Sequence, residues 1–257
     1  MRHVVPLVAL AFACRTPAPV APKDAGPQAP TTLDPAAIDA WLASELKSRG
    51  VVGASVLIVH EGATVFAKGY GTRTVGKQEP IDQDTPFHVG SVGKQITCGA
   101  VMLLAEDGKL KLTDPVAKYY PQLVRANDIT LDDLGAHMSG YRDFYPLDYM
   151  DARMSKAIEP DELIARYAGL PLDYEPRARS SYSNTGYAIL GRVAERVSGM
   201  PLAQLLQQRI FKPLGMTHSA YGTVPPGAAT GHDSFLLGPR EARAPEAAGW
   251  AIGAFGV

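Results

Sequence analysis

The sequence has little cysteine, no surplus of charge of either sign and no long apolar run. Two cysteines among 257 residues exclude both a disulfide framework and a cysteine-based zinc site. The 25 basic and 26 acidic side chains nearly cancel, which argues against a nucleic-acid partner and against a polybasic membrane patch. The length suits one large domain or two small ones, and 46% hydrophobic residues suffice for a real core.

The first 14 residues have the pattern of an export signal. A weakly positive start precedes an apolar run at 4–13, which is shorter than the roughly 20 residues that span a bilayer. The end of this run, with Cys14 directly after Ala13, resembles a bacterial lipobox, in which the cysteine is lipidated and becomes the first mature residue. Ordinary cleavage after Ala13, with Cys14 incidental, is the alternative. We therefore predict a signal peptide at 1–14, export to the periplasm or the exterior, and a lipid anchor at Cys14.

Residues 15–33 are predicted to form a tether. They are rich in alanine and proline and nearly free of large apolar side chains, so they cannot bury enough surface to fold. A signal, an anchor and a semi-extended spacer together would hold a domain at some distance from a membrane. The folded domain is expected to be 34–257.

Local patterns in 34–257 predict a helix, a β-hairpin and then a mostly helical region. Asp34 and Pro35 suit the start of a helix that ends at Gly50. Two runs of β-forming residues, 51–60 and 63–70, flank a two-residue turn and predict the hairpin. We expect no further strand before Val257. A helix, a hairpin and a helical region in this order make the predicted fold class α+β. The expected later helices cover 91–107, 130–137, 160–168, 184–198 and 201–211.

Two S-x-x-K tetrads occur, and only one has the context of a nucleophile. On a helix, positions i and i+3 share a face, so the Lys94 amine can reach the Ser91 hydroxyl and act as its base. Ser91 opens a predicted helix, where the positive helix end favours a developing anion. An N-cap role for Ser91 is the alternative. The second tetrad, Ser44 with Lys47, lies late in the first helix, where a cation complements the dipole in a structural role.

Tyr182-Ser183-Asn184 is the one Y-x-N triplet in the chain. Tyr182 can relay protons beside a lysine. Asn184 can cap the helix that follows and can hold a substrate amide, because its side chain both donates and accepts hydrogen bonds. The alternative is that Asn184 is only the cap and Tyr182 only a core residue.

Five segments together point to one family. They are a segment around Ser91, the loop after its helix, an L-x-x-H-x-S-G turn, the Y-x-N segment and a P-L-G-M segment, at 87–95, 107–116, 134–140, 182–187 and 213–216. In this order they resemble the serine β-lactamase and penicillin-binding protein superfamily, in particular its branch of class C β-lactamases, D-Ala-D-Ala peptidases and related esterases. The resemblance covers most of 34–257 and implies a β-lactamase/transpeptidase-like fold.

The resemblance also implies a mechanism. Ser91 would attack a carbonyl and form an acyl-enzyme, Lys94 and Tyr182 would share the acid–base work, and Asn184 would orient the substrate amide. The implied substrate is a small molecule or a peptidoglycan-like peptide: a β-lactam, a D-Ala-D-Ala peptide or an ester. No metal ligand set such as H-E-x-x-H occurs, and neither a metal nor an organic cofactor is implied.

One departure from the family concerns its third motif, a Lys-Thr-Gly or His-x-Gly on a late strand. The end of the sequence holds neither: Gly231-His232-Asp233 lacks the glycine and shows no strand pattern. The resemblance therefore implies strands beyond Val257 that would complete the sheet and the oxyanion hole. Two readings stay open, an active serine hydrolase and a truncated non-catalytic remnant or penicillin-binding protein with little or no turnover. His88, three residues before Ser91, offers a Ser–His alternative.

Overall fold

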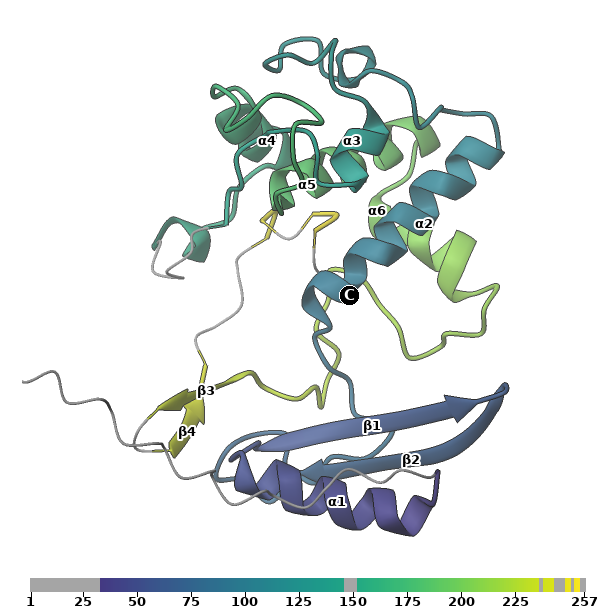
Figure 1. Ribbon diagram of the computed structural model, residues 1–257, viewed down its shortest axis with the longest axis vertical. Coiled ribbons are helices and arrows are strands. Elements are labelled where there is room, and N and C mark those ends of the chain that lie inside the picture. Colours follow the sequence, from purple (N-terminus) through teal and green to yellow (C-terminus); the bar gives the residue numbers. More distant parts are fainter. Residues whose placement is uncertain (1–32, 146–151, 236–237, 243–247, 251, 255–257) are drawn as a thin grey trace, which may run out of the picture. The chain divides into compact units, whose positions relative to one another are not determined.

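The computed structural model describes residues 33–145, 152–235, 238–242, 248–250 and 252–254 (Figure 1). The predicted signal at 1–14, with Cys14, and the tether up to residue 32 lie outside these residues, so both stay predictions. Within the described ranges, no helix combines the length and the apolar character needed to cross a bilayer. The chain divides into two compact units, 1–49 and 50–257.

The described part of the first unit is helix α1 (Pro35–Ser48). Asp34 caps it as predicted, because its Oδ1 accepts a hydrogen bond of 3.0 Å from the backbone N–H of Ala36. Pro35 occupies the first turn, where its missing N–H costs nothing. The predicted helix is therefore confirmed.

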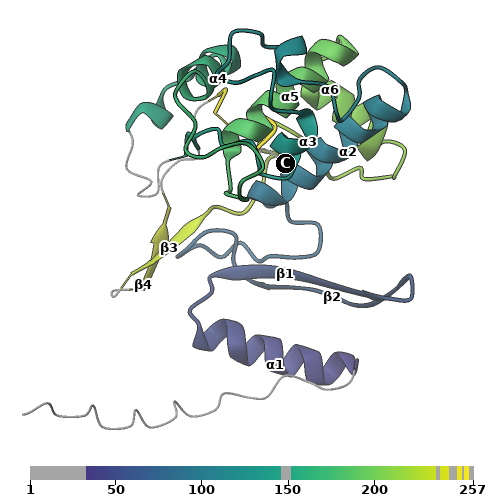
Figure 2. The same ribbon diagram turned by 45° about the horizontal axis from the view of Figure 1, so that its top comes forward.

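The second unit begins with the predicted hairpin, strands β1 (Gly53–His60) and β2 (Ala63–Gly71) (Figure 2). Glu61 and Gly62 form its turn with φ values of 49° and 79°. Positive φ at both central residues is the geometry that matches the right-handed twist of the two strands. A bulge between Ile58 and Val59 shifts the register once along the ladder.

Helix α5 is the centre of the helical region, and α2, α3, α4 and α6 all pack against it or against each other (Figures 1 and 2). Its residues from Asn184 to Gly191 are buried without interruption, because neighbours cover the helix all round at this end. Each predicted helix is found, although the one predicted at 130–137 is shorter, a 3₁₀ turn opens the one at 91–107 and a π-turn ends the one at 201–211. The elements are η1 (Gly90–Val92), α2 (Gly93–Glu106), η2 (Val116–Lys118), α3 (Leu131–Gly135), η3 (Ala152–Ser155), α4 (Pro160–Ala168), α5 (Asn184–Ser198), α6 (Leu202–Leu206) and η4 (Gln207–Phe211).

The expectation that no further strand occurs is wrong. Strands β3 (His232–Phe235) and β4 (Gly238–Glu241) pair antiparallel and form a second small sheet. The pattern is hard to read because each strand has only four residues and Pro239 lies within β4. In the described part of the chain, β3 and β4 pair with each other and not with β1 or β2.

Candidate active site

Ser91 lies in a single 3₁₀ turn, η1, that leads directly into helix α2. Lys94 is the second residue of α2, and its Nζ donates a hydrogen bond of 3.1 Å to Ser91 Oγ. The predicted i, i+3 geometry therefore brings the two groups together. Ser91 is not the cap of α2, because Val92 holds that position and makes no side-chain cap bond. The Ser91 side chain is exposed and open to a substrate.

The second S-x-x-K tetrad, Ser44 with Lys47, has the structural setting expected for it. Ser44 and Lys47 are both on α1, and Lys47 lies in its last turn. A cation there complements the negative end of the helix dipole. The same four-residue pattern thus occurs once in an active-site setting and once without it.

Tyr182 completes a pair of contacts on the Ser91 hydroxyl. Its Oη lies 2.5 Å from Ser91 Oγ, and its ring is 4.8 Å from Lys94 Nζ. Tyr182 is half exposed, so the interpretation of this side chain as a core residue is wrong. The ring of His137 stacks on Tyr182 with centroids 4.6 Å apart and fixes its position.

His137 belongs to the L-x-x-H-x-S-G turn, and the structure shows its contacts. Its backbone has a φ of 59°, and its Nδ1 accepts the backbone N–H of Ser183 at 3.1 Å. Burial lowers the pKa of His137, and the charge of Lys94 lowers it further. A neutral ring is the form that accepts from Ser183, so both effects preserve the support for the Tyr182 segment.

Asn184 is the first residue of α5 and not its cap, contrary to the capping prediction. Ser183 is the cap, and its side chain accepts from Gly186 N at 3.4 Å. The Asn184 side chain therefore serves other contacts, and its Oδ1 accepts from Lys94 Nζ at 2.7 Å. The side chain is buried, with 4% of the residue exposed. Its role in holding a substrate stays a prediction.

Asp143 belongs to the site although the sequence offers no signal for it. It follows the turn after α3, and its carboxylate accepts from Asn184 Nδ2 at 3.2 Å and 3.1 Å and from Asn184 N at 3.0 Å. Tyr145 N donates to the same carboxylate at 3.1 Å. The neighbouring carbonyl of Arg142 accepts from Thr185 Oγ1 at 2.6 Å. This loop is thereby tied to the first turn of α5.

The ammonium group of Lys94 is buried, and this burial changes its pKa. The residue is 6% exposed, and burial lowers its pKa to about 8, while the Asp143 carboxylate opposes that shift. Desolvation disfavours the ammonium because water no longer stabilises the charge. With a pKa of about 8, roughly a tenth of the Lys94 side chains carry the neutral amine at about pH 7, and the neutral amine is the form that a general base requires.

Another acceptor around Lys94 comes from a segment close to the end of the chain. Nζ donates to the carbonyl of Ala254 at 2.7 Å, and Thr97 Oγ1 donates to the carbonyl of Gly253 at 2.9 Å. Gly253 lies against Gly191 of α5, where an added Cβ on Gly191 would come within 2.9 Å of Gly253 Cα. Two glycines thus allow the close approach that carries the Ala254 carbonyl to Lys94.

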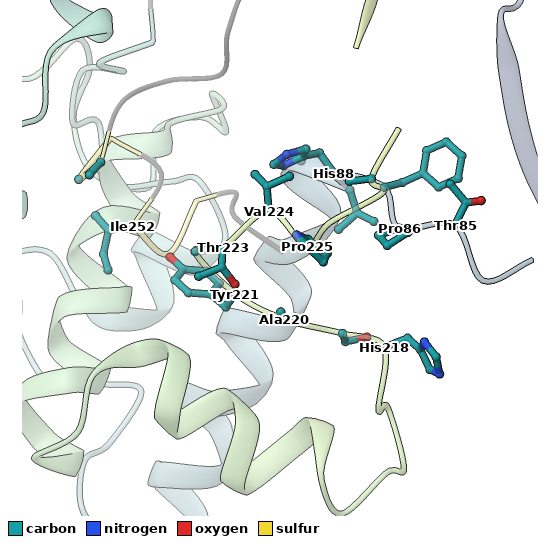
Figure 3. A pocket seen from close by; sticks show the side chains of 18 of the residues that line it. Thr85, Pro86, His88, His218, Ala220, Tyr221, Thr223, Val224, Pro225 and Ile252 are labelled. Atoms are coloured by element: carbon teal, nitrogen blue, oxygen red, sulfur yellow. The ribbon is translucent and has the colours of Figure 1, made fainter. Parts of the chain in front are cut away.

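Gly90, the residue before Ser91, is part of the lining of a cavity of about 1050 Å³. His88, Tyr221 and Val224 contribute to its wall, and Figure 3 shows them around one space. The hydroxyl of Ser91 contacts Tyr182 and Lys94, so the geometry favours this arrangement over the Ser–His alternative. The other wall residues come from 83–89, 157–160, 218–225, 228, 248–249 and 252.

The expectation that His232 has no strand around it is wrong, because His232 opens β3. Its Nε2 accepts the backbone N–H of Val75 at 2.9 Å, so the ring is held by the loop after β2. No cluster of three or more histidine, cysteine, aspartate or glutamate side chains suited to a metal ion is found among the residues the structure describes.

Comparisons with known proteins identify relatives of this chain. The chain is 32% identical over 180 residues to the candidate penicillin-binding protein PbpX of Bacillus subtilis, a match that covers 70% of this chain and 44% of PbpX. The octameric penicillin-binding protein homologue of Pyrococcus abyssi superposes with a TM-score of 0.71 at 29% identity, over 85% of this chain and 52% of that one. The D-amino acid amidase of Ochrobactrum anthropi superposes with a TM-score of 0.74 at 25% identity, over 84% and 64%. The chain thus spans less than two thirds of each of these relatives. A family model described as Beta-lactamase matches residues 38–256, and the chain therefore belongs to the serine β-lactamase and penicillin-binding protein superfamily.

Proposed function

We propose that this protein is a serine hydrolase that works through an acyl-enzyme on Ser91. The observation that carries the proposal is the position of Ser91 Oγ, 3.1 Å from Lys94 Nζ and 2.5 Å from Tyr182 Oη. A hydroxyl is a weak nucleophile unless a nearby group takes its proton, and two such groups are within hydrogen-bond reach.

The chemical steps follow from these contacts. Ser91 Oγ attacks the carbonyl carbon of an amide or ester, and its proton passes to the neutral amine of Lys94. The bond to the leaving nitrogen or oxygen breaks, and Tyr182 supplies the proton that the leaving group needs. Water then attacks the acyl-enzyme, one of its protons passes to Ser91 Oγ as the acid is released, and the proton on Lys94 returns to Tyr182.

We propose a small acyl donor as substrate: a β-lactam, a D-Ala-D-Ala peptide or other peptidoglycan-like amide, or an ester. The penicillin-binding and D-amino acid amidase relatives support this range. The mainly apolar cavity beside Gly90 offers room for a side group of the substrate. We propose further that the protein acts outside the cytoplasm, held by a lipid on Cys14.

A second candidate is a penicillin-binding protein that acylates with little or no turnover. The similarity to penicillin-binding proteins favours this candidate.

The test uses the full chain with a chromogenic cephalosporin, a D-alanyl-D-alanine peptide and a p-nitrophenyl ester. We expect acid release from at least one of them by the wild type and by Ser44→Ala, and none by Ser91→Ala. A stoichiometric adduct on Ser91 without release would select the second candidate. Equal rates for wild type and Ser91→Ala would contradict both.

A further inference from the structure

Asn184 presents an amide whose two ends are nearly the same shape but opposite in hydrogen bonding. Oδ1 accepts, and Nδ2 donates. Rotation of the amide by 180° would place a donor where the acceptor now faces Lys94. Some contact must therefore select one orientation, and the structure shows which contact does so.

The selecting group is the carboxylate of Asp143. An ionised carboxylate can only accept hydrogen bonds, and both of its oxygens lie within 3.2 Å of Asn184 Nδ2. The donor end of the amide must face Asp143, which leaves Oδ1 directed at Lys94 at 2.7 Å. Backbone N–H groups of Asn184 and Tyr145 hold the carboxylate in place at 3.0 Å and 3.1 Å.

This orientation decides where the lone pair of a neutral Lys94 points. A neutral amine has two N–H donors and one lone pair. Two of its contacts, both at 2.7 Å, are to acceptors that have no proton to give, Asn184 Oδ1 and the Ala254 carbonyl. These two contacts use both N–H bonds. The lone pair can then face the Ser91 hydroxyl, whose oxygen lies at 3.1 Å.

We propose that Asp143 is a positioning residue, which fixes the Asn184 amide so that the base lone pair of Lys94 is directed at Ser91. The proposal rests on the proposed acyl-enzyme function and adds a residue to it. With the amide reversed, Nδ2 would face Lys94 and compete for the lone pair, and Ser91 would lose its base. Asp143 itself touches neither Ser91 nor a substrate in this account.

The test is Asp143→Asn in the full chain, with Asp107→Asn as the matched control. Asp107 is also a paired carboxylate, held by Arg209 Nη1 at 2.6 Å at the end of α2, and it takes no part in the site. The readout is the second-order rate of acylation by a fluorescent penicillin between pH 6 and pH 10. We expect the high-pH plateau to fall at least tenfold in Asp143→Asn and to stay within twofold of wild type in the control.

The acylation rate at the high-pH plateau distinguishes a positioning effect of Asp143 from an effect of its charge on the Lys94 pKa. Removing the Asp143 charge further lowers the Lys94 pKa, which alone would move the acid limb to lower pH and leave the plateau unchanged. A shifted limb with an unchanged plateau would therefore overturn the proposal. So would equal losses in Asp143→Asn and in Asp107→Asn.

A swapped pair, Asp143→Asn with Asn184→Asp, tests the orientation itself. The amide introduced at position 143 can then donate to the new carboxylate at position 184, whose other oxygen accepts from Lys94. We expect the plateau to recover at least threefold over Asp143→Asn, with the acid limb moved to higher pH by the adjacent charge. No recovery in a folded double variant would overturn the proposal.

A readout that needs no catalysis distinguishes failure of this inference from failure of the proposed function. Carbon-13 NMR of the Lys94 side chain follows its titration in wild type, Asp143→Asn and Asp107→Asn. We expect the midpoint to fall only in Asp143→Asn. An unchanged midpoint there would show that Asp143 does not act on Lys94, whatever the acylation rates are.

Discussion

The hydroxyl oxygens of Tyr182 and Ser91 lie 2.5 Å apart, although 91 residues separate them in the chain. Such a short contact between two hydroxyl groups places one proton within reach of either oxygen. His137 holds the tyrosine ring from behind by stacking, with centroids 4.6 Å apart. Under the proposed mechanism, this contact is the route by which a proton passes between Ser91 and the leaving group of the substrate.

Replacement of Tyr182 by phenylalanine is expected to lower acylation by about a hundredfold or more, the usual size of a general acid–base contribution. The ring stays and the stacking on His137 is retained, so the fold should be preserved. Tyr141→Phe is the control, because it also loses a tyrosine hydroxyl. That hydroxyl donates a hydrogen bond of 2.9 Å to the backbone carbonyl of Val124 and not to Ser91. Acylation rates for the two variants check the prediction, and equal rates would refute it.

The acylation rate should rise with pH, with an apparent pKa near 8. Burial lowers the pKa of Lys94 to about 8, and only the neutral amine can accept the Ser91 proton. Below that pH the ammonium dominates, and the rate falls about tenfold for each unit. A profile that is flat from pH 6 to pH 9 would exclude Lys94 as the base.

The same lowered pKa predicts a pH dependence of stability. The unfolded chain binds a proton on Lys94 up to pH 10.5, whereas the folded chain releases it near pH 8. Stability from this group is therefore present above pH 10.5 and is lost as pH falls through 8. The free energy of unfolding of wild type minus that of Lys94→Met should grow by on the order of 3 kcal/mol from about pH 7 to about pH 10.5. Urea denaturation at several pH values measures it, and a constant difference would contradict the shift.

Gly253→Ala should displace the Ala254 carbonyl that accepts a hydrogen bond from Lys94. Gly253 has a φ of 65°, and an added Cβ would lie 2.2 Å from the Tyr187 carbonyl, so the segment must move and carry the Ala254 carbonyl away from Lys94. Gly199→Ala is the control, because it has a similar φ of 71° with no atom within 4 Å. Both variants should lose roughly 1–2 kcal/mol to backbone strain. Only Gly253→Ala should also lose acylation, by at least tenfold, and equal acylation in the two variants would rule out this role.

Local signals predict much of the fold and the first contacts of the site. The cap at Asp34, the turn at Glu61-Gly62 and the spacing of Ser91 and Lys94 each depend on neighbouring residues, so the chain alone specifies them. The Tyr182 segment can be found because its motif is recognisable beside the tetrad.

The sequence does not reveal contacts between residues that lie far apart in the chain and belong to no recognisable motif. Asp143 reaches Asn184 over 41 residues, and the Ala254 carbonyl reaches Lys94 over 160. A loop aspartate and a backbone carbonyl carry no local pattern that marks them for such contacts. Strand β3 escapes prediction for a related reason, because pairing with β4 and not alternation of its four residues defines it.

The proposed function requires that Ser91 becomes acylated. Intact-protein mass spectrometry after incubation with a penicillin, followed by peptide mapping, tests it most directly in wild type, Ser91→Ala and Ser44→Ala. We expect one added penicillin per chain, on the peptide that holds Ser91, in wild type and in Ser44→Ala, and none in Ser91→Ala. An adduct that persists in Ser91→Ala, or no adduct in wild type with a penicillin, a D-alanyl peptide or an activated ester, would contradict it.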